Sequence, residues 1–221
     1  MKTMPKTSKS NQDSSLPAPP SKSLSLALVR RFNQGDEGAF EELMAYYADR
    51  VLGMVMYLMG PRLRSLYDSE DLTQEIWAEI YKSLPSSPPT ISFGSWVWRI
   101  AERKISRLGH RAGKIPIPNS TLKKGEESSS TSPLEPSAAS ASPSSVARKR
   151  ESTERLIRAI ESLSFQERLL IQLRWFKEKS YDEVGAELAK TPASSRMAMK
   201  RAMVRLEKIL GPLDWSSSAN H

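Results

Sequence analysis

The sequence predicts an all-α protein of two small helical domains joined by a flexible linker. Apolar residues recur at intervals of three and four along most of residues 24–114 and 151–213, which places them on one face of an α-helix. No stretch alternates apolar and polar residues between turn signals, as a half-buried strand does. Between the two helical stretches the chain is rich in Ser and Pro, a composition that buries too little to offset its ordering entropy.

Composition divides the 221 residues into five segments. We expect disordered tails at residues 1–23 and 214–221, because they contain few residues to bury. The first helical domain is expected at residues 24–114 and the second at 151–213. Residues 115–150 form the expected linker, and we expect the two domains to pack little against each other.

The residue content excludes several classes of function. The chain has no cysteine and two histidines, one of them the last residue, so no disulfide, thiolate metal site or cysteine nucleophile is available. We expect no catalytic, metal or cofactor site.

The formal charge of +8 favours a polyanionic partner, either nucleic acid or an anionic membrane surface. No apolar run approaches the roughly 18 residues of a membrane span, and the N-terminus resembles no secretory signal, which predicts an intracellular protein without membrane insertion.

Helix signals in the first domain are strong. Apolar residues from Phe40 to Leu58 form one helical stripe, which Gly60-Pro61 should end. Asp68 is a suitable N-cap for a second helix that ends at Pro85. A loop follows, and Ser95 is the expected cap of a third helix.

The second domain repeats these signals. Its first helix is expected at residues 152–163. Ser164 and Ser180 each stand three residues before a Glu, the spacing of a capping box. A last helix is expected at about residues 194–210, after a Thr-Pro turn and before a Gly-Pro stop.

Residues 180–210 have the layout of a helix-turn-helix. The spacing of Met199, Ala202, Leu206 and Ile209 places these residues on an inward face. The same rotation turns outward or to the flank Arg196, Met197, Lys200, Arg201 and Arg205. Such a basic face suits the DNA major groove, and an ordinary helical hairpin with a solvated basic face fits equally well.

Two further stretches carry a chemical signal. The spacing of Asp71, Gln74 and Glu75 places them on one side of the second helix. This side is either a face that docks on another protein or a solvated acidic face. A metal site or acid–base catalysis is disfavoured, because no third group converges on these residues.

Residues 93–114 mix two tryptophans with six basic residues. Rings interleaved with cations suit single-stranded DNA, although a tryptophan in a small helical domain is more often part of the core.

Together and in this order, these stretches resemble the sigma-70 family of bacterial transcription initiation factors, in its extracytoplasmic-function (ECF) group. The resemblance covers residues 26–111 and 154–210. It rests on NQGDEGAFEELMAYYADRV, DLTQEIW, FGSWVWRIAERKISRLGHR and SYDEVGAELAKTPASSRMAMKRAMVRL. It implies sigma region 2 in the first domain and a region 4 helix-turn-helix in the second.

The resemblance implies a function and its partners. It implies a sigma factor without enzymatic activity or cofactor, which binds the clamp coiled coil and flap of core RNA polymerase. Such a factor directs transcription from specific promoters by recognising the −35 element and melting the −10 element. An anti-sigma factor is a further possible partner. The implied location is the cytoplasm, at the nucleoid when the factor is part of the holoenzyme.

The resemblance also assigns residues. Polymerase would bind Asp71, Gln74 and Glu75. The loop at residues 86–94 would hold an extruded base. The melted −10 element would meet Phe93, Trp96, Arg99, Arg103, Lys104, Arg107 and Arg111. The −35 groove would meet Ser194, Ser195, Arg196, Met197, Lys200 and Arg201.

The chain departs from the family pattern at several of these positions. Arg103 and Arg107 stand where the family commonly has Asn and Asp, which adds positive charge beside the DNA. Ser194-Ser195 replaces a usual Thr-Val, and Ala198 and Met203 replace frequent arginines. We therefore expect an unusual −10 preference and weaker or altered −35 discrimination.

Two other functions compete with this one. A helix-turn-helix regulator that acts without polymerase is the main alternative, and the DLTQEIW stretch argues against it because a simple repressor needs no docking helix. A nucleic-acid hydrolase using Asp71 and Glu75 is the second, and it predicts divalent-metal-dependent activity from the isolated chain.

Overall fold

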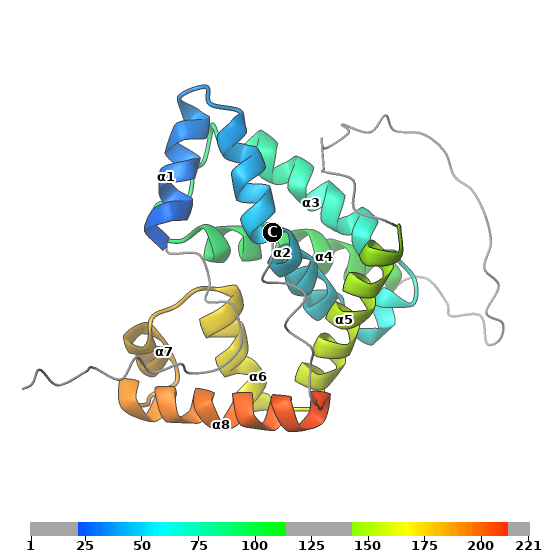
Figure 1. The fold of residues 1–221 in the computed structure, drawn as a ribbon, viewed down its shortest axis with the longest axis vertical. Helices are drawn as coiled ribbons and strands as arrows, with labels where there is room; N and C mark the ends of the chain where they lie inside the picture. Colours follow the sequence, from blue (N-terminus) through cyan, green and yellow to red (C-terminus); the bar gives the residue numbers. More distant parts are fainter. Residues whose placement is uncertain (1–21, 114–142, 212–221) are drawn as a thin grey trace, which may run out of the picture.

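The computed structural model describes residues 22–113 and 143–211, and these residues form eight α-helices, one π-helix and no strand (Figure 1). The predicted all-α class is therefore confirmed for the described parts of the chain. Residues 1–21, 114–142 and 212–221 lie outside the described residues, and with them lie the predicted tails and most of the predicted linker. Within the described ranges, no helix combines the length and the apolar character needed to cross a membrane.

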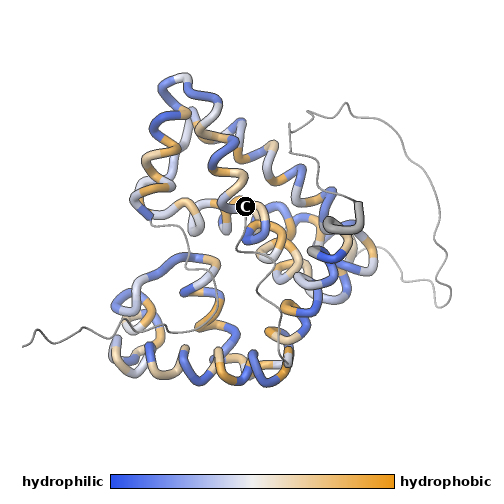
Figure 2. Tube along the Cα trace, in the orientation of Figure 1, coloured by the Kyte–Doolittle hydropathy of each residue, from blue (hydrophilic) through white to orange (hydrophobic). Residues whose placement is uncertain are grey.

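The first half of the molecule is a four-helix assembly. It comprises α1 (Lys22–Asn33), α2 (Gly38–Arg64), α3 (Ser69–Ser83) and α4 (Phe93–Ala112). Each helix buries apolar residues, and Figure 2 shows hydrophobic and hydrophilic residues alternating along these helices. Aromatic rings join α1, α2 and α3, because Phe40 lies 5.4 Å from Phe32 and 5.9 Å from Trp77 between ring centroids.

Local signals account for most helix ends in this half. Asp68 caps α3 as predicted, accepting hydrogen bonds from the backbone N–H groups of Glu70 and Asp71. Gly60 has non-helical backbone angles (φ 61°, ψ 174°), so α2 consists of two helical segments that meet at a kink where Gly60-Pro61 was predicted to stop the helix. The second segment continues to Arg64. Ser92, rather than the predicted Ser95, caps α4, because the Ser92 hydroxyl accepts the Ser95 backbone N–H at 3.1 Å.

The second half contains α5 (Pro143–Glu161), α6 (Phe165–Ile171), the π-helix η1 (Gln172–Phe176), α7 (Tyr181–Glu187) and α8 (Pro192–Leu210). Helix α5 begins at Pro143, so residues 143–150, assigned above to the linker, are helical. Pro is well tolerated in a first helical turn. Arg150 adds a tertiary anchor, because its guanidinium pairs with the Asp68 carboxylate at 3.2 Å.

Both predicted capping boxes are present. Ser164 caps α6 and Ser180 caps α7, each exchanging hydrogen bonds with the Glu three residues later. Helix α8 starts two residues earlier than predicted, because the Thr191 hydroxyl accepts the Ser194 backbone N–H and Pro192 occupies the first turn. Gly211, with φ of 71°, ends α8.

The two halves share one hydrophobic core, so the expectation that they pack little against each other is wrong. Phe176 of η1 stacks on Trp98 of α4 with ring centroids 5.7 Å apart. Arg64 of α2 donates to both carboxylate oxygens of Glu161 of α5, at 2.8 and 2.9 Å. Residues of η1 and α5 thus complete the core beneath α2 and α4. Figure 1 shows α8 on the far side of this junction, forming the lower edge of the molecule.

Candidate nucleic-acid and polymerase interfaces

Helix α3 presents the predicted polar face to solvent. The Asp68 cap fixes where the helix starts, and Leu72, Ile76 and Ile80 turn into the core. Asp71, Gln74 and Glu75 are exposed on the opposite side. The structure therefore places the three predicted polymerase-binding residues together on one accessible face.

Ion pairs join this face to α4. Glu75 lies 2.8 Å from the Lys104 ammonium, and Glu79 lies 2.7 Å from the Arg103 guanidinium. Two candidate sites that the sequence analysis treated separately are therefore adjacent. Such partly exposed pairs contribute about 0–1 kcal/mol each, so they can open readily when a partner binds.

Helix α4 carries a basic stripe along its outer side. The exposed residues of this stripe are spaced four apart, and they are Arg99, Arg103, Arg107 and Arg111. Lys104 lies beside the stripe and is partly buried. Four cations along one helix, with little acidic charge among them, can follow a phosphate backbone.

The two aromatic residues predicted for DNA stacking are in the core instead. Phe93 is 0% exposed and Trp96 is 6% exposed, and their rings pack with centroids 6.0 Å apart. They share the apolar side of α4 with Val97 and Ile100. In this conformation neither ring is available to a base, because the helical repeat that turns the arginines outward turns these rings inward.

A cavity of about 410 Å³ opens between α1 and the loop that precedes α4. Helix α1 contributes Leu26, Val29, Arg30, Asn33 and, just after its end, Gln34; the loop contributes Pro88, Pro89 and Thr90. Three residues of the predicted base-holding loop thus form one wall of an open depression. Sequence reasoning missed the other wall, because a Ser/Leu-rich segment with two arginines gives no signal of what it faces.

The α7–α8 turn has the tightness of a helix-turn-helix. A Cβ added at Gly185 would lie 2.6 Å from the Lys190 carbonyl oxygen and 3.3 Å from the Pro192 nitrogen. Ala189 adopts φ of 51°, in the left-handed region. The turn therefore requires glycine at position 185 to let the backbones approach so closely.

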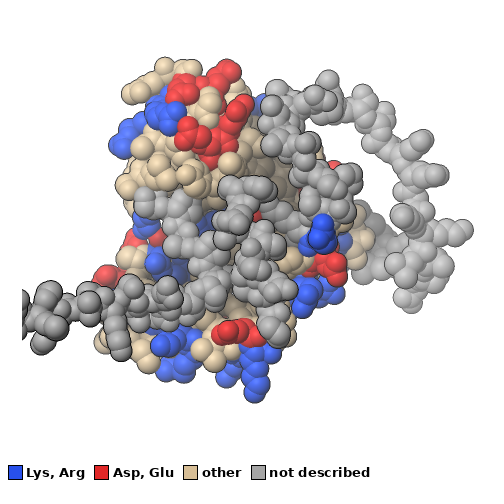
Figure 3. All heavy atoms as spheres, in the orientation of Figure 1, with Lys and Arg blue, Asp and Glu red and all other residues tan. Residues whose placement is uncertain are grey.

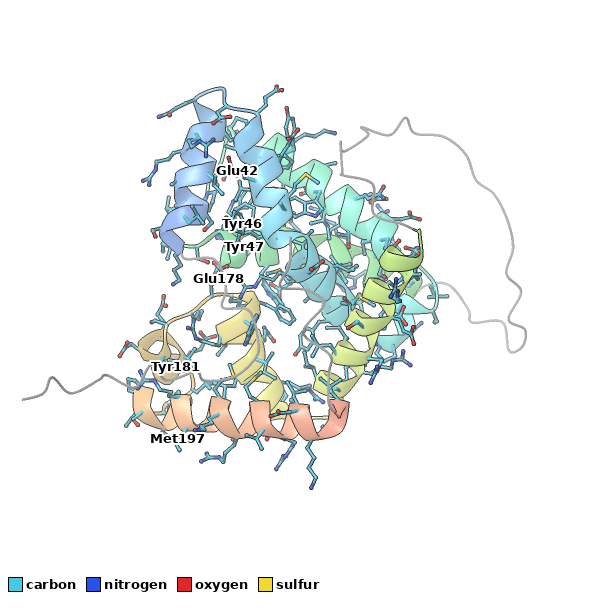
Figure 4. The ribbon with its side chains drawn as sticks, viewed as in Figure 1. Glu42, Tyr46, Tyr47, Glu178, Tyr181 and Met197 are labelled. Carbon is cyan, nitrogen blue, oxygen red and sulfur yellow. The ribbon has the colours of Figure 1, made fainter. Side chains whose placement is uncertain are left out.

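Helix α8 shows the predicted rotation over most of its length. Met199, Ala202 and Leu206 are buried. The predicted groove-facing residues that are exposed are Ser194, Arg196, Met197, Lys200 and Arg201. Met197 lies on the outer side of α8 in Figure 4. Figure 3 shows Lys and Arg side chains along this lower edge of the molecule.

Two residues of α8 contradict the prediction. Ser195, assigned to the groove, is 0% exposed because its first-turn position faces α6 and α7. Ile209, assigned to the inward face, is 48% exposed, and in the last turn of α8 it is Leu210 that packs against the core.

Neighbouring groups orient two cations of α8. The Arg196 guanidinium lies 5.1 Å from the centroid of the Tyr181 ring, a cation–π distance. Arg205 pairs with Glu167 at 2.9 Å. The pKa of Glu167 is lowered, first by the hydrogen bond from the Ser164 hydroxyl and then by the Ser164 backbone N–H and Arg205. Arg205 is therefore held against α6, whereas Arg196 projects from the helix start.

Among the described residues, no three His, Cys, Asp or Glu side chains converge as ligands for a metal ion. The metal-dependent hydrolase considered above thus has no candidate centre in that part of the chain.

Comparison with protein families identifies both halves. Residues 43–114 match the family model described as Sigma-70 region 2, and residues 159–208 match the one described as Sigma-70, region 4. The chain is 27% identical over 188 residues to the ECF RNA polymerase sigma-E factor of Escherichia coli K12, covering 84% of this chain and 94% of that protein.

Two further proteins match over most of this chain. The RNA polymerase sigma-H factor of Pseudomonas aeruginosa is 24% identical over 187 residues, covering 84% of this chain and 93% of its own length. A solved structure of CnrH in complex with the cytosolic domain of CnrY matches with 19% identity and a TM-score of 0.43, covering 85% of this chain and 97% of that one.

Proposed function

Because this chain belongs to the sigma-70 family, in its ECF group, we propose that three exposed faces perform its function: α3, α4 and α8. The protein is a sigma factor, a non-enzymatic subunit whose partners are core RNA polymerase and promoter DNA. The single observation that carries the residue-level proposal is that α3, α4 and α8 each bury an apolar side and expose the polar residues of their motif.

Helix α3 docks on polymerase. Its exposed face carries Asp71, Gln74 and Glu75, and negative charge on an otherwise basic protein selects a complementary basic surface on the partner. The ion pair between Glu75 and Lys104 couples this face to α4, so polymerase binding frees a cation for DNA.

Helix α4 and the α1 cavity hold the melted −10 element. The arginines at positions 99, 103, 107 and 111 neutralise phosphates of the single strand. The cavity between α1 and the loop at residues 86–92 receives an extruded base, with Arg30, Asn33, Gln34 and Thr90 as its polar groups. Phe93 and Trp96 support this surface from the core rather than stacking on bases.

Helix α8 reads the −35 element in the major groove. Arg196, Lys200 and Arg201 are its cations near the helix start, and Met197 supplies an exposed apolar contact of the kind that packs on a thymine methyl group. Arg196 is pre-positioned by Tyr181. The protein acts in the cytoplasm, at the nucleoid when part of the holoenzyme, and an anti-sigma factor is a candidate regulator.

Reconstitution with core polymerase tests this proposal. Transcription start sites mapped across a genome with the reconstituted holoenzyme should share one −35 and one −10 sequence, and the isolated chain should bind duplex promoter DNA far more weakly. A regulator that acts without polymerase gives the opposite result, with tight binding by the isolated chain and no new start sites.

A further inference from the structure

An aromatic ring orients Arg196, the first cation of the proposed −35 helix. The Arg196 guanidinium lies over the ring of Tyr181, 5.1 Å from the ring centroid. Tyr181 is the first residue of α7, and Figure 4 shows it beside the first turns of α8. Arg196 is exposed, and within the described residues no carboxylate pairs with it. The ring is therefore the contact that holds this guanidinium in place before DNA binds.

A second arginine supports the same ring. The Arg174 guanidinium lies over Tyr181, 5.0 Å from the ring centroid, and it donates a hydrogen bond to the Lys179 carbonyl oxygen at 3.1 Å. Arg174 is partly buried, unlike the exposed Arg196. The Ser180 capping box fixes the start of α7 directly before the ring. Tyr181 is thus held both by its backbone and by a cation, which makes it a firm support for Arg196.

The supporting arginine belongs to the π-helix η1. The Lys177 backbone N–H donates to the Gln172 carbonyl oxygen, five residues earlier, at 2.9 Å. This extra residue in the turn rotates the side chains of η1 away from the directions that a regular α-helix gives them. Such π-bulges occur mostly at functional sites. Here the bulge carries the cation that lies over the Tyr181 ring.

The orientation of Arg196 matters because few other side chains of α8 can perform its task. Residues 192–201, which begin α8, contain Arg196 and Arg201 as their only arginines. Arginine reads guanine through two parallel hydrogen bonds, and this contact requires the planar guanidinium in one orientation. A side chain already held in that orientation loses less conformational entropy when it contacts the base.

Resting on the proposed function, we propose that Tyr181 is a positioning residue for −35 recognition. Its ring, supported by Arg174, aims Arg196 at a guanine and so sets the preference at one G·C pair of the −35 element. Tyr181 acts through Arg196 and has no need to contact DNA in this role. A phosphate contact by the Tyr181 hydroxyl or by Arg174 is a different role, because it would strengthen binding to every sequence alike.

Promoter binding by the reconstituted holoenzyme tests this role. Tyr181→Leu removes the ring and keeps an apolar side chain, whereas Tyr181→Phe removes only the hydroxyl. Each base pair of the −35 element is substituted in turn, and competition with the native promoter measures the preference at each position. Tyr181→Leu should lower the preference at one G·C pair by about two- to fivefold, the range expected for a cation–π contact at an exposed site. Tyr181→Phe should retain the preference.

The chain offers a matched control. Phe165 follows the capping residue Ser164 at the start of α6, as Tyr181 follows Ser180 at the start of α7. Phe165 is 70% exposed, and among the described residues no arginine or lysine lies over its ring. Phe165→Leu should therefore leave every −35 preference unchanged. Adding Tyr181→Leu to Arg196→Ala should cause no further loss, because the ring acts only through Arg196.

A measurement on the free full-length chain is independent of promoter binding. The NMR order parameter of the Arg196 Nε–H group reports how mobile this side chain is on the picosecond-to-nanosecond timescale. Tyr181→Leu should lower the order parameter, and Tyr181→Phe and Phe165→Leu should leave it unchanged. Arg174→Gln keeps the ring and removes its support, so it should produce a smaller decrease. Urea denaturation establishes that each variant is folded.

The outcomes separate the positioning role from the proposed function. Loss of preference at the same base pair in Tyr181→Leu and Arg196→Ala, with greater mobility of Arg196, supports the proposal. Equal weakening on all promoters with a smaller salt dependence indicates a phosphate contact and overturns it. An order parameter unchanged in both Tyr181→Leu and Arg174→Gln also overturns it. If the wild-type holoenzyme shows no −35 preference, the proposed function fails, whereas the order parameter still decides whether Tyr181 orients Arg196.

Discussion

Helices α4 and α8 are both basic and both proposed to contact DNA, yet they are built differently. Helix α4 lies within the shared core and buries Phe93, Trp96 and Trp98, so its basic stripe is one side of a structural element. Helix α8 lies at the edge of the molecule and buries no aromatic residue, only Ser195, Met199, Ala202 and Leu206. The comparison indicates that substitutions in α4 affect folding and binding together, whereas those on the outer face of α8 affect binding alone.

The largest effect should come from the core side of α4. Trp96→Ala should lower the free energy of unfolding by about 3–5 kcal/mol, because it removes a large buried side chain and leaves a cavity. Urea denaturation measures this, with Trp96→Phe as the milder control. A base-stacking Trp96 predicts nearly unchanged stability and weaker promoter opening, and that result would break the comparison between the two helices.

The outer face of α8 should give the opposite pattern. Arg196→Ala and Lys200→Ala should each cost about 1–3 kcal/mol in holoenzyme binding to a native promoter if the residue reads a base. Stability should change by no more than about 0.5 kcal/mol, as for an exposed surface substitution.

Competition with DNA whose −35 element is scrambled separates base reading from phosphate contact. A lost preference identifies a base reader, and uniform weakening with a smaller salt dependence identifies a phosphate contact. Full retention of the preference in both variants places −35 recognition elsewhere in the chain.

Charge reversal on α3 tests whether its face is separate from α4. The double variant Asp71→Lys and Glu75→Lys should weaken core polymerase binding by at least about tenfold, or 1.4 kcal/mol, because opposite charges then become like charges. Copurification and a binding titration measure this. Glu102→Lys, an exposed acid on α4, is the control. Equal binding by the double variant and wild type removes α3 from the interface.

The smallest effect concerns the caps of the region 4 half. The pKa of Glu183 is lowered, chiefly by the Ser180 backbone N–H. A carboxyl group with a lower pKa in the folded state adds stability above its unfolded pKa, and that stability is lost as the pH falls through its folded pKa.

Ser180→Ala keeps this backbone N–H but removes the hydroxyl, which caps α7 and also lowers the pKa of Glu183. It should cost about 1 kcal/mol near pH 7, with a smaller difference from wild type at about pH 3, below the unfolded pKa of about 4.3. Urea denaturation of both proteins at the two pH values measures this. A difference that stays constant with pH argues that the hydroxyl acts without Glu183.

Much of this architecture was predictable because its causes are local. Asp68, Ser164 and Ser180 cap the starts of their helices through hydrogen bonds that span two or three residues. The rotation of α8 follows from the spacing of Met199, Ala202 and Leu206. The exposed polar face of α3 follows in the same way from its buried stripe.

The predictions fail where contacts with another part of the chain determine whether a side chain is buried or exposed. Ser195 was predicted to face the groove but is covered by α6 and α7, and Ile209 was predicted to be buried but Leu210 packs on the core in its place. Trp96 stands among cations in the sequence, yet the helical repeat carries it into a core that is shared with the other half.

The sequence by itself determined most of the helices, the caps at Asp68, Ser164 and Ser180, the order of the motifs and most of the polar faces of α3 and α8, because hydrogen bonds and periodicity act within a few residues. Only the tertiary structure decided that the two halves close on each other. Glu178 stands between two lysines in the sequence, as a solvated charge would. Its partner Arg50 is 128 residues away, and burial of both makes the pair a structural determinant, since a charge removed from water must find its partner inside the fold.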